Sequence, residues 1–246
     1  MNPQIETVYI PYNLNDNKLC LNDMEVFMKH QGPITIITKL DDTSTINVNN
    51  ATVINTCDIE NVYDYIGCCD MMRRIPLGWL NYDEYRTSLE TINSDMVISY
   101  YCKGKNVFVN EANDKIIRTL SIMTNELAEL NIKPNDVQIV KNLSVCKNVN
   151  LYYDMTLKQI NRIINKYAFS GGCDTKEEQQ VKGANLEVDE CYKIISKFGD
   201  NEMIKYIEDY YGSKGSQSVK ILSGEVKRIC SSLIYEMFNK IKRVKS

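Results

Sequence analysis

The chain has a single histidine, His30, among its 246 residues, and this scarcity removes several kinds of catalytic site. A catalytic site that needs two histidines, or a metal site with several histidine ligands, cannot form within one chain. A phosphate-binding P-loop is also missing, as is the G-x-G-x-x-G pattern of dinucleotide-binding folds. The sequence therefore predicts no bound cofactor and no metal centre.

Long hydrophobic runs are absent as well. No apolar stretch approaches the roughly 18 residues of a membrane span, and the first residues lack the basic start and apolar core of a signal peptide. The nine cysteines show no C-x-x-C spacing, which favours reduced thiols over a disulfide framework. These absences predict a soluble intracellular protein that does not interact with a membrane.

What is present is the composition of a folded protein. Hydrophobic residues make up 43% and charged residues 25%, both close to the average of globular domains. The net charge of -3 argues against a wholly basic nucleic-acid coat, although it leaves room for a local basic patch.

The first part of the chain alternates between two hydrophobic patterns. Runs of strand length rich in β-branched and aromatic residues alternate with segments of helical periodicity. The predicted strands are residues 8–12, 34–38, 51–54, 96–101 and 137–140, and the predicted helices are residues 19–31, 59–74, 82–92 and 113–130. This alternation predicts an α/β fold with a mostly parallel sheet and helices on both faces.

Beyond residue 144 the pattern becomes helical only. We predict helices over residues 155–169, 186–198, 202–211 and 219–244, with a polar loop over residues 170–183. The predicted organisation is an α/β domain over residues 1–144, a helical insertion over residues 145–218, and a C-terminal amphipathic helix over residues 219–246. We expect this last helix to belong to the α/β domain.

The opening strand, its polar turn and the following helix carry a resemblance to a known family. The segment from Val8 to Asn22 resembles the Y-x-R-V-S-T-x-x-Q-x-L-x-L-Q pattern that opens serine recombinases, the resolvases and invertases. The helix that begins near Gly224 is similar to the long dimerisation helix of that family. Considering its size as well, the chain is identified as a member of the poxvirus family of resolvase-like proteins, which implies a resolvase-like fold.

The departures from the recombinase pattern fall on its chemistry. Pro11 replaces an arginine, Asn13 replaces the nucleophilic serine, and Met237 replaces an arginine of the long helix. An amide cannot form the covalent DNA intermediate that this chemistry needs. Lys103 and Lys105 stand near the family's D-R-L-G-R position and are candidates for phosphate binding, but lysine lacks the guanidinium fork. The resemblance therefore implies a protein without recombinase activity.

The C-terminal helix carries an apolar stripe and several basic residues. One interpretation is a helix folded onto its own sheet, and the other is a self-association helix with a basic tip near nucleic acid. We slightly favour self-association and hence a homo-oligomer. The stripe consists of Val226, Ile229, Leu233, Met237 and Ile241.

These observations lead to one hypothesis and two alternatives. The hypothesis is a catalytically inactive, serine-recombinase-like protein of a large DNA virus that acts as a binding or scaffold protein. It would work with a host or viral protein partner in the host cytoplasm, with the nucleus as an alternative. The second is a DNA-binding accessory protein that uses Lys103, Lys105 and the basic helix. The third is an enzyme with phosphate-directed chemistry at Asp16, Asp95 or Asp114.

Overall fold

The chain forms two compact units in a computed structural model. One unit comprises Met1–Asn142 with Arg243–Ser246, and the other comprises Leu143–Lys242. The structure describes residues 6–11, 18–30, 32–38, 46, 48–55, 98, 101–102, 104–129, 136–141, 149–212 and 221–242. None of the helices in these ranges is long and apolar enough to cross a membrane.

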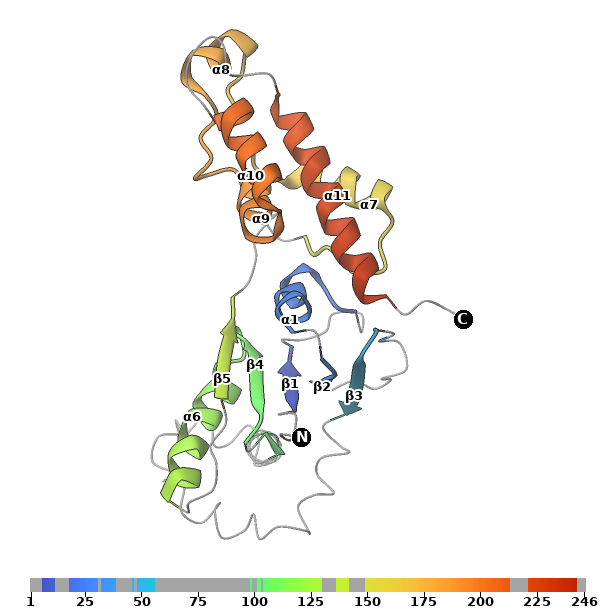
Figure 1. Ribbon diagram of the computed structural model, residues 1–246, viewed down its shortest axis with the longest axis vertical. Coiled ribbons are helices and arrows are strands. Elements are labelled where there is room, and N and C mark those ends of the chain that lie inside the picture. The colour runs from blue at the N-terminus through green and yellow to red at the C-terminus, as the bar shows by residue number, and fades with distance from the viewer. Residues whose placement is uncertain are drawn as a thin grey trace, which may run out of the picture. The chain divides into compact units, whose positions relative to one another are not determined.

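The first unit is built on a parallel sheet of five strands, all of which lie in the described part of the chain (Figure 1). The strand order is β3-β2-β1-β4-β5, and every neighbouring pair is parallel. The strands are β1 (Thr7–Ile10), β2 (Ile34–Thr38), β3 (Ala51–Asn55), β4 (Asn106–Asn110) and β5 (Asp136–Val140). The predicted α/β fold with a mostly parallel sheet is therefore confirmed.

Successive side chains of the interior strands point to opposite faces of this sheet, and they are buried on both faces. Val8 and Ile10 of β1 join Ile116 and Leu120 of helix α6 (Asp114–Glu129) in one hydrophobic cluster. Tyr9 lies between Val8 and Ile10 in β1, so its side chain points to the opposite face of the sheet. There its ring meets that of Phe27 edge-on, with 6.4 Å between centroids. Phe27 belongs to helix α1 (Met24–Lys29), which follows a short 3-10 turn, η2 (Leu21–Asp23).

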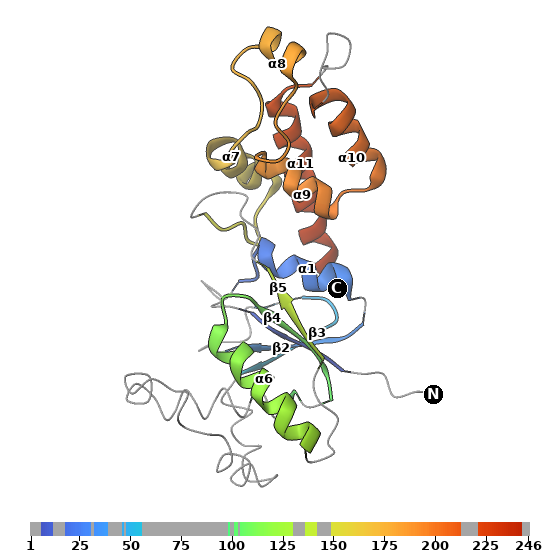
Figure 2. The same ribbon diagram turned by 90° about the vertical axis from the view of Figure 1, so that its left-hand side faces the viewer.

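The second unit is helical in the ranges that the structure describes (Figure 2). Its longest helix there, α11, packs against α7 and α9. Side-chain oxygens at the N-caps start several of the shorter helices, as Thr156 does for α7 and Asp189 for α9. The elements are α7 (Leu157–Tyr167), α8 (Lys176–Lys182), α9 (Glu190–Phe198), α10 (Asn201–Ile207), the π-helical segment η6 (Glu208–Gly212) and α11 (Ser223–Ile241).

The main error in the predicted elements concerns the middle of the sheet. Strand β4, which pairs with both β1 and β5, was not predicted. A strand was predicted over residues 96–101 instead, but Ile98 and Tyr101 are helical. Both segments are short and apolar, and only pairing with β1 distinguishes them. The predicted loop over residues 170–183 contains α8, while the predicted helices over residues 59–74 and 82–92 lie outside the described residues.

The boundary between the units also differs from the predicted organisation. We expected the C-terminal helix to return to the α/β domain, whereas α11 belongs to the same unit as α7 to α10. The reason is its apolar stripe, which is buried against α7 and α9. The segment predicted as an insertion and the C-terminal helix together form one helical unit.

Candidate functional site

The strand order creates one special position on the sheet. From β1 the chain proceeds to β2 and β3 on one side, whereas from β4 it proceeds to β5 on the other. The connections therefore diverge between β1 and β4, at their carboxyl ends. In open α/β sheets, ligands bind in the crevice outside the strands at such a topological switch point. Pro11 follows β1 there, and Glu111 follows β4.

Two asparagines hold the backbone at this switch point. The Asn113 side-chain amide donates hydrogen bonds to the carbonyl oxygens of Pro11 at 3.0 Å and Ile10 at 3.4 Å. Asn110 Oδ1 accepts a hydrogen bond from the Ala112 backbone N–H at 3.0 Å. These bonds tie the turn after β4 to the end of β1. The switch point is thus a rim of fixed backbone groups.

The rim continues to the next strand and to a helix. The Glu111 N–H donates to the Val140 carbonyl at the end of β5, at 2.8 Å. Helix α6 begins at Asp114 directly after this turn, so its positive N-terminal end lies at the same edge of the sheet. Asp114 is exposed in the first turn, where a carboxylate is stabilised by the helix dipole.

A buried polar cluster lies beside the switch point, on the face of the sheet that carries α1. Tyr9 and Asp23 are 0% and 2% exposed, and the Tyr9 hydroxyl donates to Asp23 Oδ1. The other carboxylate oxygen accepts the Cys20 N–H at 2.6 Å. Burial raises the pKa of Asp23 above its usual value, while the bonds from Tyr9 and Cys20 act to lower it. The cluster joins β1 to the segment before α1.

The same cluster keeps its other two groups protonated. Burial, together with the Asp23 charge, raises the pKa of Tyr9, while a hydrogen bond from Asn110 acts in the other direction. Burial and the same carboxylate raise the pKa of Cys20 to about 12. Asn110 thus connects the buried cluster to the rim at the end of β4. The Cys20 thiol is not activated as a nucleophile, because its thiolate is disfavoured.

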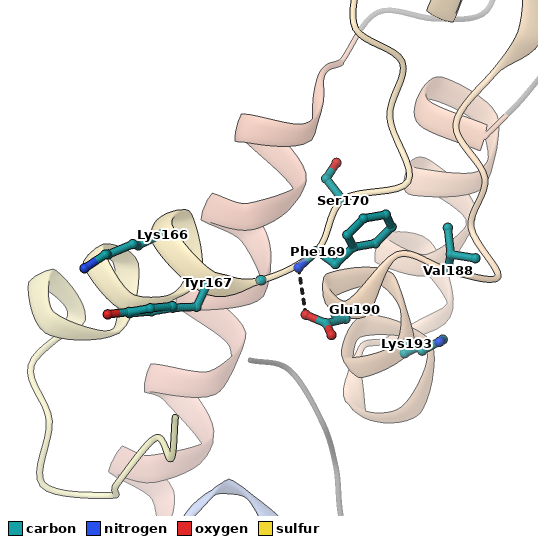
Figure 3. Close-up of a pocket in the computed structure, with 8 residues that line it drawn as sticks. Lys166, Tyr167, Phe169, Ser170, Val188, Glu190 and Lys193 are labelled. Atoms are coloured by element: carbon teal, nitrogen blue, oxygen red, sulfur yellow. Dashed lines mark hydrogen bonds between the residues drawn. The ribbon is translucent and has the colours of Figure 1, made fainter. Parts of the chain in front are cut away.

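A separate cavity of about 680 Å³ lies within the helical unit (Figure 3). It is lined by the end of α7, the loop that follows, and the start of α9. Its apolar part is unusually exposed, with Phe169 59%, Tyr167 44% and Val188 41% accessible. Glu190 Oε2 accepts the Phe169 N–H at 2.7 Å, and in Figure 3 this bond joins the loop to α9. The lining residues are Lys166, Tyr167, Ala168, Phe169, Ser170, Val188, Glu190 and Lys193.

This cavity combines flat aromatic surfaces with positive charge. Lys166 and Lys193 are exposed, and each comes from a helix that borders the cavity. Exposed aromatic rings offer stacking surfaces for unpaired bases, and neighbouring lysines attract phosphates. The arrangement suits an unpaired stretch of nucleic acid.

Two of the three degenerate catalytic positions that the recombinase pattern suggested lie in the described part of the chain, one in each unit. Pro11 is buried and lies at the switch point, but Asn13 lies outside the described residues. Met237 is 1% exposed in α11 of the helical unit. Its side chain is one of the buried hydrophobic residues of this helix.

Of the two candidate phosphate ligands, the structure describes Lys105. Lys105 precedes β4, so it lies at the amino ends of the strands, opposite the edge where α/β sheets bind ligands. Its ammonium group pairs with Glu6 at 2.7 Å and lies 3.6 Å from the centroid of the Tyr101 ring. Lys103 lies outside the described residues.

The structure also places the predicted self-association stripe and part of the candidate acidic site. Four of the five stripe residues are buried within the helical unit, and the fifth, Ile229, is half-buried. Of the three aspartates of the alternative enzyme, only Asp114 is described, and Asp16 and Asp95 are not. Within the described ranges, no group of three or more His, Cys, Asp or Glu side chains is placed to hold a metal ion.

Sequence reasoning missed the switch-point asparagines, the Tyr9–Asp23 cluster and the cavity. A signal for the first was present: the apolar run Val107–Val109 is followed by a polar turn and a strong helix, the pattern of a strand that leads into a crossover. The other two depend on contacts between distant residues. They leave no local pattern.

Comparison with known proteins identifies relatives of a different kind from those expected. No protein-family model matches the sequence. The cytoplasmic tryptophan–tRNA ligase of Arabidopsis thaliana is 35% identical over 100 residues, which cover 40% of this chain and 24% of the ligase. The ligase of Saccharomyces cerevisiae is 39% identical over 82 residues, 33% of this chain and 18% of the ligase. The matches therefore span about a quarter or less of these relatives.

Solved structures agree over nearly the whole chain. The tryptophanyl-tRNA synthetase of Plasmodium falciparum superposes with a TM-score of 0.70 and 17% identity, covering 96% of this chain and 76% of that one. The enzyme of Campylobacter jejuni, in complex with ADP and tryptophan, gives a TM-score of 0.57 and 12% identity, covering 95% and 86%. The chain therefore shares the fold of these synthetases, which includes a parallel α/β domain with a Rossmann-like strand order. The similar proteins in both kinds of comparison are tryptophan–tRNA ligases.

These findings overturn the identification as a resolvase-like protein. The resemblance to poxvirus resolvases is wrong, and so are the predictions of an inactive recombinase and of a chain that is no enzyme, because the relatives are ligases. The quoted motif failed for a physical reason. A short strand, a polar turn and an amphipathic helix open many α/β folds, so these features alone do not distinguish one family from another.

Proposed function

We propose that this chain acts on tryptophan and its tRNA as a tryptophan–tRNA ligase-like enzyme. The observation that carries the proposal is the 35% identity over 100 residues to the Arabidopsis ligase. Because that match covers 24% of the ligase, the reaction, its substrates and a cytoplasmic location are all parts of the proposal.

The α/β unit offers a place for the small substrates. The carboxyl ends of β1 and β4 form the switch point at which sheets of this kind bind ligands. The Campylobacter neighbour was solved with ADP and tryptophan, so a nucleotide and the amino acid are the ligands to test first. The bonds from Asn113 to the carbonyls of Ile10 and Pro11 support this site, because they fix its backbone before a ligand arrives.

The helical unit offers a place for the tRNA. Its cavity is lined by the rings of Tyr167 and Phe169 and by two lysines, Lys166 and Lys193, with one carboxylate, Glu190. This set of aromatic rings and mainly positive charges suits an unpaired segment of RNA. Bases splayed out of an RNA loop stack on such rings, each with a contribution of about 1–3 kcal/mol. A tRNA contains several unpaired loops, so a site of this chemistry fits the nucleic-acid substrate of the proposed reaction.

An aminoacylation assay tests the proposal directly. The purified chain is incubated with radiolabelled tryptophan, ATP and total tRNA, and acid-precipitable tRNA-bound label is counted. We expect label that mild alkali releases, as it hydrolyses an ester, and no label when phenylalanine replaces tryptophan. A chain that binds neither tryptophan nor tRNA would contradict the whole proposal. Binding of both without transfer would refute the reaction alone.

A second experiment tests the RNA-binding cavity. Replacing both Lys166 and Lys193 with alanine removes two positive charges, so the slope of log affinity against log salt should fall by about one per lysine. The matched control is Lys158→Ala, which removes an exposed lysine of α7 outside the cavity. An unchanged slope in the double variant would place the tRNA elsewhere.

A further inference from the structure

A continuous chain of hydrogen bonds supports the loop that borders the cavity of the helical unit. The Gly172 N–H bonds to Ser170 Oγ at 3.2 Å. Ser170 Oγ lies 3.0 Å from the Tyr211 hydroxyl, which donates to Asp189 Oδ2 at 2.9 Å. The loop is thus connected to η6 through Tyr211 and to the N-cap of α9 through Asp189.

The direction of each bond in this chain is fixed by the number of protons available. Tyr211 has one hydroxyl proton and gives it to the carboxylate, so Ser170 must donate to the Tyr211 oxygen. Burial is the main reason that the pKa of Tyr211 is raised, which keeps this proton on the phenol. Tyr211 and Asp189 are 0% and 2% exposed, and hydrogen bonds in such surroundings polarise and strengthen one another.

Asp189 secures the same loop a second time. Its Oδ2 atom also accepts the Gly171 N–H at 2.9 Å, while Oδ1 accepts the Tyr192 N–H at 2.9 Å at the start of α9. On its other side, Gly171 accepts the Asn185 N–H at 2.8 Å. A Cβ atom added at Gly171 would lie 1.9 Å from the Asn185 carbonyl oxygen, so this close approach requires glycine. The loop backbone is therefore held from both sides.

We infer that Tyr211 is a positioning residue for RNA binding in the cavity, and this inference rests on the proposed function. Tyr211 does not line the cavity, whereas Phe169 and Ser170 of the supported loop do. Its hydroxyl orders that loop before RNA arrives. The entropy cost of ordering the loop therefore does not reduce the free energy of RNA binding. Loss of the hydroxyl weakens binding without removing any group that touches the RNA.

The test is Tyr211→Phe, which keeps the buried ring and removes only the hydroxyl. The matched control is Tyr206→Phe, which removes a tyrosine hydroxyl of the same unit that bonds to Glu225 instead of the loop. We expect Tyr211→Phe to weaken tRNA affinity roughly three- to tenfold, the value of about one hydrogen bond. The amides of Gly171 and Gly172 should exchange faster, while the salt slope stays that of the unchanged chain, since no charge is lost.

A second pair of variants keeps the inference testable should Tyr211→Phe fold poorly. Ser170→Ala breaks the hydrogen-bond chain at its other link and should weaken binding similarly, and Ser170→Thr retains the hydroxyl and should restore it. Equal tRNA affinity of the unchanged chain and of both Tyr211→Phe and Ser170→Ala overturns this inference and leaves the proposed function standing. Failure of the unchanged chain to bind tRNA overturns the RNA-binding proposal itself.

Discussion

Replacing Tyr9 with phenylalanine should destabilise the α/β unit through a single lost hydroxyl. The ring is fully buried and its contact with Phe27 remains, so no cavity forms. What disappears is the bond to Asp23 Oδ1, and one oxygen of a buried carboxylate loses its donor. Hydrogen bonds to charged groups contribute about 1.5–3 kcal/mol. We therefore expect the free energy of unfolding to fall by about 2–3 kcal/mol where the Asp23 carboxyl is ionised.

The size of this loss should depend on pH, with a definite sign. Burial raises the pKa of Asp23 in the folded chain, so its contribution to stability is complete below the unfolded pKa near 4 and is lost as pH rises through the folded pKa. The Tyr9 bond acts to lower that folded pKa, so removing it raises the pKa further. The penalty of Tyr9→Phe should therefore increase as pH rises through the folded pKa of Asp23, and it should shrink to about 1 kcal/mol near pH 4, below that pKa.

Hydrogen exchange during urea unfolding is a suitable assay, because the two units need not unfold together and peptides from β1 and β4 report on the α/β unit alone. The matched control is Tyr101→Phe, which keeps the ring beneath Lys105 and leaves Asp23 untouched. The reasoning is refuted if the penalty of Tyr9→Phe does not grow as pH is raised from about 4 through the folded pKa of Asp23, or if it stays within the ~0.5 kcal/mol of an ordinary surface change.

Two further substitutions probe the switch point and the helical core. Asn113→Ala removes the bonds to the carbonyls of Ile10 and Pro11, and should cost about 1–2 kcal/mol and weaken tryptophan and nucleotide binding, as measured by calorimetry. Unchanged ligand affinity would show that this rim does not shape the site. Met237→Ala should lower the stability of the helical unit by about 2–5 kcal/mol in thermal unfolding, because the side chain is 1% exposed. Glu236→Ala, one position away and exposed, should change it by less than about 0.5 kcal/mol, and equal effects of the two would refute burial as the cause.

The elements that sequence reasoning found are those with a strong local pattern. The β-branched run of β2 and the four- and three-residue steps of α6 appear within a few residues, so they could be identified without tertiary information. Strand β4 was missed, although it is an interior strand of the sheet, between β1 and β5. Its sequence, Asn106–Asn110, is short and polar at both ends, and it becomes a strand by pairing with β1 and β5.

The contacts that form the candidate sites could not be predicted from the sequence for a related reason. Asn113 bonds to the carbonyl of Ile10, 103 residues earlier in the chain, and no periodicity links such positions. The absent G-x-G-x-x-G motif also proved a poor guide. It argued against a nucleotide-binding type of fold, yet the strand order is that of a Rossmann-like sheet, which depends on pairing and not on a glycine pattern.

By itself, the sequence determined the α/β character of the first part, the helical character of the second, and the exclusion of sites that need more than one histidine. Hydrophobic periodicity and residue counts are local properties, so they are fixed before the chain folds. Only the tertiary structure decided that β1 and β4 meet at a switch point, that α11 joins the helical unit, and that Tyr211 supports the loop beside the cavity. Each of these features depends on which distant segments pack together. That packing is determined by many mutually supporting contacts throughout the core and not by any local pattern.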